Sequence, residues 1–227
     1  MLAHDISNIL NNINLSLQLA ASESNSIKLP EKLRFLPRMI RSQVQDGLTL
    51  LSNIQKISEL ETKKIEIEKV DAGVLLEEII TNLTLCNNSD VLFEIEKPDT
   101  KIEVLADAFL KDIFENILLN GIKHNQSENK WIKVRISYEY YKENENIVPT
   151  KFVKFEFIDN GIGIPDALKQ KIFNRQHRST ISSKGMGIGL SLVKTLIDAF
   201  NGKIWVDNLI KNDYTKGSIF TVLIPKA

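Results

Sequence analysis

Two stripes of apolar side chains run along roughly the first 60 residues, with the three- and four-residue spacing of amphipathic helices. The first stripe consists of Leu2, Ile6, Ile9, Ile13, Leu17 and Ala20. The second consists of Leu33, Leu36, Ile40, Val44, Leu48, Leu51, Ile54 and Ile57. Because an interior proline costs about 3 kcal/mol, the regular second helix is predicted to begin near Pro37. The pattern predicts a helical hairpin.

Two helices cannot cover both stripes by themselves, because a lone hairpin leaves one side of each stripe in water. A symmetric homodimer that forms a four-helix bundle is the simplest arrangement that covers them. The alternative is a hairpin that packs on the second half of the chain, and it is the less favoured of the two.

Beyond Lys64 the pattern becomes mixed α/β. The predicted helices run from a cap at Asp71 to about Leu83, over Ala108–His124, and over Leu190–Phe200 with Gly202 as its C′ glycine. The predicted strands are Val91–Glu96, Ile102–Leu105, Trp131–Tyr141, Lys151–Ile158, Lys203–Val206 and Ser218–Ile224. The chain is therefore predicted to divide into a helical domain at 1–65 and an α/β domain at 66–227.

Charge and composition limit the classes of binding partner that the sequence leads us to expect. The 227 residues include 29 basic and 29 acidic side chains, so net charge gives no general reason to expect nucleic acid or an anionic membrane. The single cysteine excludes an internal disulfide. No apolar run approaches the ~20 residues that span a bilayer, and the start lacks the features of a signal peptide. We expect a piece of a longer protein, whose remainder could hold a membrane span.

The first polar cluster is His4-Asp5-Ile6-Ser7-Asn8. His4 and Asn8 share one helix face beside the apolar stripe, so the imidazole is predicted to be accessible to solvent. An exposed imidazole can act as a nucleophile, and Asp5 can orient it and take its proton. Taken alone, the cluster fits a surface histidine on a polar helix face better than a catalytic one.

The second cluster places Asn116, Asn120 and Lys123 at i, i+4 and i+7, as one polar line on an otherwise apolar helix. An asparagine oxygen suits Mg²⁺ and a lysine suits phosphate. The alternative is a pair of capping asparagines near a fraying helix end. Because buried carboxamides need partners, a functional interpretation is favoured.

The third cluster is Asp159-Asn160-Gly161-Ile162-Gly163-Ile164-Pro165, directly after a predicted strand. Asp159 offers an acceptor for an exocyclic amine, and the two glycines let the backbone approach a ligand closely. A tight Asn-Gly turn is the alternative, and it explains Asn160 and Gly161 but not Gly163.

The fourth cluster, Gly185-Met186-Gly187-Ile188-Gly189-Leu190, opens a helix, where backbone N–H groups can bind phosphate. It is neither a Rossmann fingerprint nor a P-loop. The stretch before it is polar and basic and predicts a mobile lid over a nucleotide. That stretch contains Phe173, Arg175, His177, Arg178 and Lys184.

In this order and spacing, the clusters resemble the boxes of the sensor histidine kinases of two-component systems. His4 to Asn8 resembles the H box in its H-D-x-x-N form, and Asn116 to His124 resembles the N box. Asp159 to Pro165 resembles the G1 box, Ile172-Phe173 with Arg178 the F box, and Gly185 to Leu190 the G2 box. The resemblance covers essentially the whole chain, although the G boxes alone would admit other ATPases of the superfamily.

The resemblance implies a cytoplasmic core in which a dimerising hairpin precedes an α/β sandwich, an ATP-binding domain of the histidine kinase/Hsp90-like ATPase type. It implies that His4 accepts the γ-phosphoryl group of ATP, with Asp5 as base, and passes it to an aspartate of a response regulator. Asn120, assisted by Asn116, would hold Mg²⁺. Asn8 would orient a water that dephosphorylates the regulator; the alternative is a solvated polar residue.

The same resemblance assigns the nucleotide contacts. Asp159 would accept the adenine amine, and His124 would stand where an aromatic residue often flanks the base. Lys123 and Arg178 would contact phosphates, and Gly185, Gly187 and Gly189 would shape the return of the lid. The predicted ATP site also includes Gly161, Gly163, Lys184 and Leu190.

Two positions depart from the family pattern. Ile9 stands where many members have proline, so the first helix is predicted to run straighter past His4, and His124 replaces the common tyrosine or phenylalanine. Neither departure removes a catalytic group. The rival interpretations are a degenerate phosphotransfer or scaffold dimer that kept the fold, and a superfamily ATPase without histidine phosphorylation.

Overall fold

The computed structural model describes residues 36–62, 65–86, 91–141, 150–174 and 188–227, together with Ile6, Leu10 and Ile13. The chain forms two compact units. One comprises residues 1–63 and 178–189, and the other comprises residues 64–177 and 190–227.

The first unit contains a long helix, α2 (Leu36–Thr62), which begins beside Pro37 as predicted. Ile6 and Ile13 of the first apolar stripe, and Leu10 between them, are also helical. Leu10 lies against α2, because a Cβ placed on Gly47 would be 3.1 Å from the Leu10 Cδ1 atom. The rest of the predicted first arm and the turn lie outside the described residues. Among the described helices, none is long and apolar enough to cross a membrane.

The second unit is built on a mixed five-stranded sheet with the order β2-β4-β5-β7-β6. Its strands are β2 (Val91–Glu96), β4 (Lys130–Tyr141), β5 (Thr150–Asp159), β6 (Lys203–Ile210) and β7 (Asp213–Pro225). The β2–β4 pair is parallel and the other pairs are antiparallel. A separate antiparallel pair joins β1 (Glu68–Asp71) to β3 (Glu103–Ala106).

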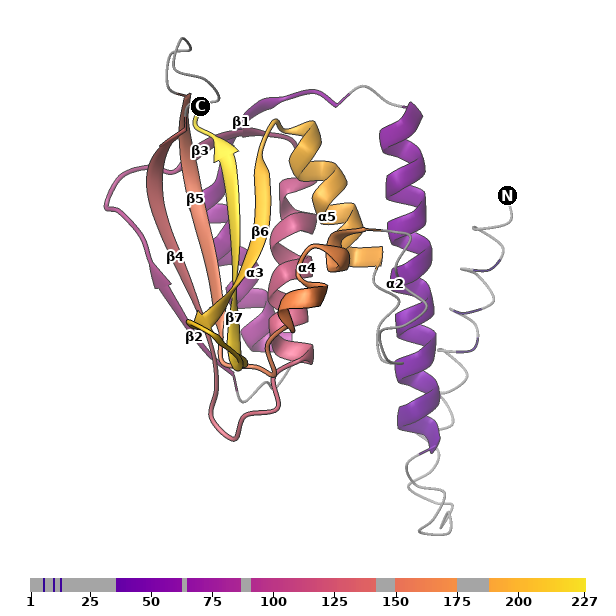
Figure 1. Cartoon of the computed structure of the whole chain (residues 1–227). Helices are drawn as coiled ribbons and strands as arrows, with labels where there is room; N and C mark the ends of the chain where they lie inside the picture. The colour runs from indigo at the N-terminus through magenta and orange to yellow at the C-terminus, as the bar shows by residue number, and fades with distance from the viewer. Residues whose placement is uncertain are drawn as a thin grey trace. The chain divides into compact units, whose positions relative to one another are not determined.

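Three helices cover one face of this sheet: α3 (Ala72–Cys86), α4 (Leu110–Lys123) and α5 (Ile188–Ala199) (Figure 1). The apolar face of α4 packs on the sheet, and the Phe114 ring lies 5.0 Å from Phe155 and 5.6 Å from Phe157 between centroids. All three rings are almost fully buried. Asp71 caps α3 as predicted, since its carboxylate accepts the Val74 N–H at 3.2 Å. The predicted α/β sandwich is confirmed.

Two strand predictions were incomplete and one capping prediction was wrong. Strand β1 was missed, and β6 and β7 are longer than predicted because they form a hairpin that turns at Asn212 with φ 64°. Gly202 is not the C′ residue of α5. Asn201 is the C′ residue, because it takes the left-handed conformation with φ 55°. Gly202 is the C″ residue of a Schellman motif, and its N–H bonds to the Ile197 carbonyl at 2.8 Å.

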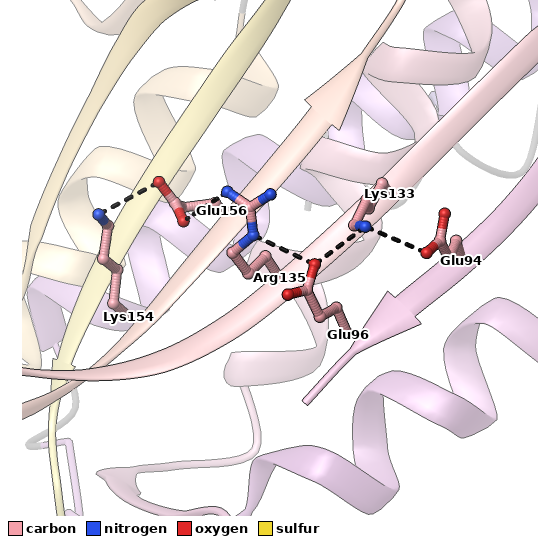
Figure 2. Close-up of polar contacts among 6 residues, drawn as sticks. All are labelled: Glu94, Glu96, Lys133, Arg135, Lys154 and Glu156. Atoms are coloured by element: carbon pink, nitrogen blue, oxygen red, sulfur yellow. Dashed lines mark hydrogen bonds and ion pairs between the residues drawn. The ribbon is translucent and has the colours of Figure 1, made fainter. Parts of the chain in front are cut away.

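The sheet face that the helices leave open carries a ladder of alternating charges across β2, β4 and β5 (Figure 2). Lys133 contacts Glu94 at 3.1 Å and Glu96 at 2.9 Å. Arg135 bridges Glu96 at 3.2 Å and Glu156 at 3.7 Å, and Lys154 contacts Glu156 at 3.1 Å. We call these six residues the charge ladder. The hydrogen bond from Lys133 holds the pKa of Glu96 below its ordinary value, and Glu96 in turn raises the pKa of Lys133.

Candidate functional site

Helix α4 carries the predicted polar line opposite its buried apolar residues. Asn116 and Asn120 are half-buried, and Lys123 is exposed as the last residue of the helix. The Asn116 amide nitrogen donates to the carbonyl of Asp112, one turn earlier in the helix, at 2.8 Å. The Asn120 carbonyl accepts the His124 N–H at 3.0 Å, which closes the helix end. Neither asparagine caps the helix with its side chain, so the capping alternative is not supported.

The chemistry of this line fits a magnesium ion. Asn116 and Asn120 offer carboxamide oxygens on one helix face, and Mg²⁺ prefers oxygen ligands. The described residues contain no group of three or more histidine, cysteine, aspartate or glutamate side chains able to hold a metal. An all-protein cage is therefore absent from the described part of the chain. The donors suit a metal that takes one or two ligands from protein and the others from phosphates and water.

Asp159, at the end of β5, has a buried carboxylate that is held on both oxygens. Oδ1 accepts the Gly161 N–H at 2.8 Å, and Oδ2 accepts the Ser218 hydroxyl at 2.6 Å. Burial raises the pKa of Asp159, and the Ser218 and Gly161 bonds partly offset that effect. Each carboxylate oxygen has a second lone pair, so Asp159 can still accept a hydrogen bond from a ligand.

Two glycines allow the loop after β5 to pass close to its neighbours. A Cβ on Gly161 would lie 2.8 Å from the His124 carbonyl oxygen and 2.9 Å from Asp159 Oδ1. Gly163 has φ +64°, and a Cβ there would overlap the Tyr214 carbonyl of the β6–β7 hairpin. These contacts place the loop between the end of α4 and the hairpin.

A network of amides, which sequence reasoning did not find, ties this loop to the end of α4. The Asn160 Oδ1 atom accepts the Asn125 Nδ2–H at 2.7 Å and the Trp131 N–H at 3.0 Å, and its Nδ2 donates to the Asn129 carbonyl at 2.8 Å. The Ser127 hydroxyl donates to the Asn160 carbonyl at 2.6 Å. Asn160 is therefore more than the tight turn suggested by the alternative interpretation of the sequence, because its side chain joins segments 29 to 35 residues away.

His124 follows the last residue of α4, and its carbonyl accepts the Ile162 N–H at 3.2 Å. Its side chain is partly exposed. Removal of water by neighbouring atoms lowers the pKa of His124 and the nearby Lys123 charge lowers it further, while Asp159 acts in the opposite direction. The imidazole is thereby favoured in its neutral form.

The structure brings only part of the predicted site together. Asn116, Asn120, Lys123, His124, Asp159, Gly161 and Gly163 lie at one end of the sheet, on α4 and the loop after β5. Gly189 and Leu190 lie in the first turn of α5, and Phe173 of the predicted F box packs edge-on against Phe220 at 6.4 Å. The residues His4, Asp5, Asn8, Arg178, Lys184, Gly185 and Gly187 lie outside the described residues.

Residues 106–227 match the family model described as histidine kinase-, DNA gyrase B-, and HSP90-like ATPase. The matched segment is more than half of the chain and contains α4, the loop after β5 and α5. The chain belongs to this ATPase family. The resemblance to the catalytic core of a sensor histidine kinase, predicted from the four clusters, is also confirmed by the relatives of this chain.

Two curated relatives extend the similarity across nearly the whole chain. Cyanobacterial phytochrome B of Nostoc sp. is 27% identical over 230 residues, which is 96% of this chain and 28% of that protein. The sensor protein kinase WalK of Staphylococcus saprophyticus is 24% identical over 215 residues, which is 91% of this chain and 33% of WalK. The chain thus spans about a third or less of the length of these relatives.

Solved structures with the same fold include two of the histidine kinase ThkA and one of full-length ShkA. The catalytic domain of ThkA is 26% identical to this chain, with a TM-score of 0.56 over 71% of this chain and 99% of that one. ThkA in complex with the response regulator TrrA has a TM-score of 0.63, 23% identity, and covers 100% of this chain and 60% of that one. Full-length ShkA in complex with AMPPNP has a TM-score of 0.68, 21% identity, and covers 100% of this chain and 45% of that one.

Proposed function

We propose that this chain is an ATP-dependent protein histidine kinase that phosphorylates His4 and relays the phosphoryl group to an aspartate of a response regulator. One observation carries the proposal. A buried carboxylate, Asp159, lies beside a helix with two ligand-type asparagines in a domain of the histidine kinase ATPase family. The same chain also has the His4-Asp5-x-x-Asn8 cluster.

The adenine end of the site rests on Asp159. Its carboxylate accepts two bonds from protein and keeps lone pairs for the exocyclic amine of adenine. Guanine has a carbonyl at the corresponding ring position, which would meet the carboxylate oxygen as a second acceptor. Preference for ATP over GTP follows. The neutral form of His124, which the lowered pKa favours, suits a flank against the uncharged base.

At the phosphate end, Asn120 and Asn116 would hold Mg²⁺, and Lys123, Arg178 and Lys184 would contact phosphates. A magnesium ion, when bound, supplies positive charge against the β- and γ-phosphates. Gly185, Gly187, Gly189 and Leu190 would offer backbone N–H groups at the start of α5. Catalysis in this class of reaction is mostly positioning and charge neutralisation, because the transition state is loose.

In the transfer, an imidazole nitrogen of His4 forms a bond to the γ-phosphorus as the bond to the bridging oxygen of ADP breaks, and Asp5 takes the imidazole proton. In the relay, the P–N bond breaks as a carboxylate oxygen of the regulator forms its bond to phosphorus. The ThkA–TrrA complex, which has the same fold, supports a response-regulator partner. Asn8, one turn beyond His4, would orient water for the reverse dephosphorylation.

The first 65 residues would form the dimerisation and phosphotransfer domain. Ile40 and Ile54 of α2 are 43% and 44% exposed, although both belong to the apolar stripe, and Leu10 already lies against Gly47 of the same helix. Burial of such apolar surface at about 25 cal/mol per Å² favours a homodimeric four-helix bundle. The balanced charge of the full chain gives no general reason to expect nucleic acid as a partner.

The deciding experiment is autophosphorylation with γ-labelled Mg·ATP. Wild-type chain should acquire a label that is lost in acid and kept in alkali, the behaviour of a P–N bond. His4→Ala should bind ATP as wild type does but acquire no label. A labelled His4→Ala variant would refute the acceptor assignment. ATP hydrolysis without any protein label would favour a superfamily ATPase. If the chain neither hydrolyses ATP nor acquires a label, a scaffold would be favoured.

A further inference from the structure

The amide network after β5 joins the two ends of the proposed nucleotide site. Its central bond runs from the Asn125 Nδ2 atom to the Asn160 Oδ1 atom at 2.7 Å. Asn125 directly follows the helix-capping His124 and is 3% exposed, while Asn160 directly follows Asp159. The bond therefore connects the end of the helix that carries Asn120 to the strand end that carries Asp159.

Both amide orientations are fixed by their other partners. Asn160 Oδ1 faces two N–H donors and its Nδ2 faces a carbonyl, so a flipped amide would lose all three bonds. Asn125 Oδ1 accepts the Ser127 N–H at 3.1 Å, which leaves its Nδ2 to donate to Asn160. Two parallel links, Ile162 N–H to the His124 carbonyl and the Ser127 hydroxyl to the Asn160 carbonyl, cross the same junction.

A junction of this kind is stiff, because a buried amide that loses its partner keeps the full cost of having left water. Separation of α4 from the loop would break several bonds at once, at a place where the Asn125 side chain has almost no access to solvent. None of the five boxes named from the sequence includes Asn125 or Ser127.

We propose that Asn125 and Asn160 act as positioning residues, a clasp that fixes the spacing between the adenine end and the metal–phosphate end of the site. The proposal rests on the proposed nucleotide function. Its consequence is energetic coupling between the two ends of the site. While the clasp is closed, Mg²⁺ and phosphates bound near Asn120 raise the affinity of Asp159 for the base, and a bound base raises the affinity for Mg²⁺ and phosphates.

The sharpest variant is Asn125→Asp, which keeps the side-chain volume and the acceptor for the Ser127 N–H. It replaces the donor to Asn160 Oδ1 with a carboxylate oxygen, so only the clasp bond is lost and a repulsion takes its place. Ser127→Ala is a second, milder variant, because it removes the parallel Ser127–Asn160 bond. Asn82→Asp, on the exposed surface of α3, is the matched control.

The full chain is titrated calorimetrically with adenosine, with ADP, and with ADP plus Mg²⁺, at a temperature where circular dichroism shows every variant to be folded. In Asn125→Asp, affinity for Mg·ADP should fall about tenfold, the effect of losing one buried hydrogen bond, while adenosine affinity changes by no more than about twofold. Ser127→Ala should change the affinities for Mg·ADP and adenosine in the same directions as Asn125→Asp, but by smaller factors. Asn82→Asp should match wild type.

A purely structural role would lower the melting temperature of Asn125→Asp but leave the ratio of Mg·ADP to adenosine affinity at its wild-type value, and that result would overturn the clasp. Equal weakening of all three ligands would overturn it too. If Asn125→Asp does not fold, Ser127→Ala decides by the same ratio. Failure of wild-type chain to bind Mg·ADP is a separate result, and it would remove the proposed function itself.

Discussion

Two polar networks lie on the same sheet, one charged and one neutral, and their side chains also differ in access to water. The charge ladder crosses the open face of β2, β4 and β5, and its carboxylates Glu94 and Glu96 have side chains 62% and 54% exposed. The amide network lies at the end of β5, where Asn125 is 3% exposed and each bond joins uncharged groups. The ladder has full charges and the amide network has none.

The difference teaches that formal charge is a poor guide to the energy of a network. Exposed ion pairs gain little, because water and salt screen them and because long side chains lose entropy when they are held. Buried amides gain a modest amount when they are paired, but they cost much more when one partner is removed. The neutral network should therefore contribute more to stability than the charged one, and it also borders the proposed nucleotide site.

The largest effect is expected for Asn160→Ala. The change removes three side-chain bonds, to Asn125, Trp131 and Asn129, and at about 1 kcal/mol each the free energy of unfolding should fall by about 3 kcal/mol. Urea denaturation measures the loss, with Asn82→Ala on the exposed face of α3 as control. A loss no greater than that of the control would contradict the ranking of the two networks.

The second largest effect is expected for Asp159→Asn, which should raise the stability of the fold instead of lowering it. Burial raises the pKa of Asp159 in the folded state, so its contribution to stability is full below the ordinary aspartate pKa and is lost as the pH rises through the folded value. Neutralisation should therefore raise the melting temperature by a few degrees near pH 8, and wild type and variant should converge at about pH 4.

Asp159→Asn also separates stability from function. The Asn carbonyl can still accept the Gly161 N–H, and its amide can donate to the Ser218 hydroxyl, so the local fold is kept. The new donor tolerates the guanine carbonyl, so discrimination between ATP and GTP in a competition assay should weaken. Wild-type discrimination together with a lowered melting temperature would show that Asp159 is structural.

For each network, the sequence pattern predicted some of the residues but not their bonding partners. Lys133 and Arg135 are two residues apart in the predicted strand Trp131–Tyr141, a spacing that puts them on one face, and in the structure both contact Glu96. Their partners on β2 could not be predicted, because the parallel pairing joins residues 39 positions apart and no local signal encodes it. For the same reason the short charged strand β1 escaped prediction, since its Glu68 pairs with Ala106 of β3.

The candidate site divides in a similar way. Asp159 and Gly163 were predicted because residue type and local spacing reveal an acceptor at a strand end and a close backbone approach. Asn125 and Ser218 were missed because an asparagine after a helix and a serine at the start of a predicted strand are common without any function. What makes them special is a bond to a residue 35 positions away for Asn125 and 59 for Ser218.

The smallest effect is expected for Glu96→Gln in the charge ladder. Glutamine keeps the shape and one acceptor oxygen, while Lys133 keeps Glu94 and Arg135 keeps Glu156 as partners. Because the pKa of Glu96 is lowered in the folded state, its stabilising contribution is present above the ordinary glutamate pKa and is lost as the pH falls through the folded value.

The loss of stability in Glu96→Gln should therefore be just measurable by urea denaturation near neutral pH and absent in acid. It should also vanish when salt is raised from about 0.1 M to about 1 M, since the screening length falls from about 10 Å to about 3 Å. Asn160→Ala should lose the same stability at both salt concentrations, because it removes no charge. A loss in Glu96→Gln that equals that of Asn160→Ala and persists in high salt would mean that the exposed ladder, and not the buried amide network, holds this sheet together.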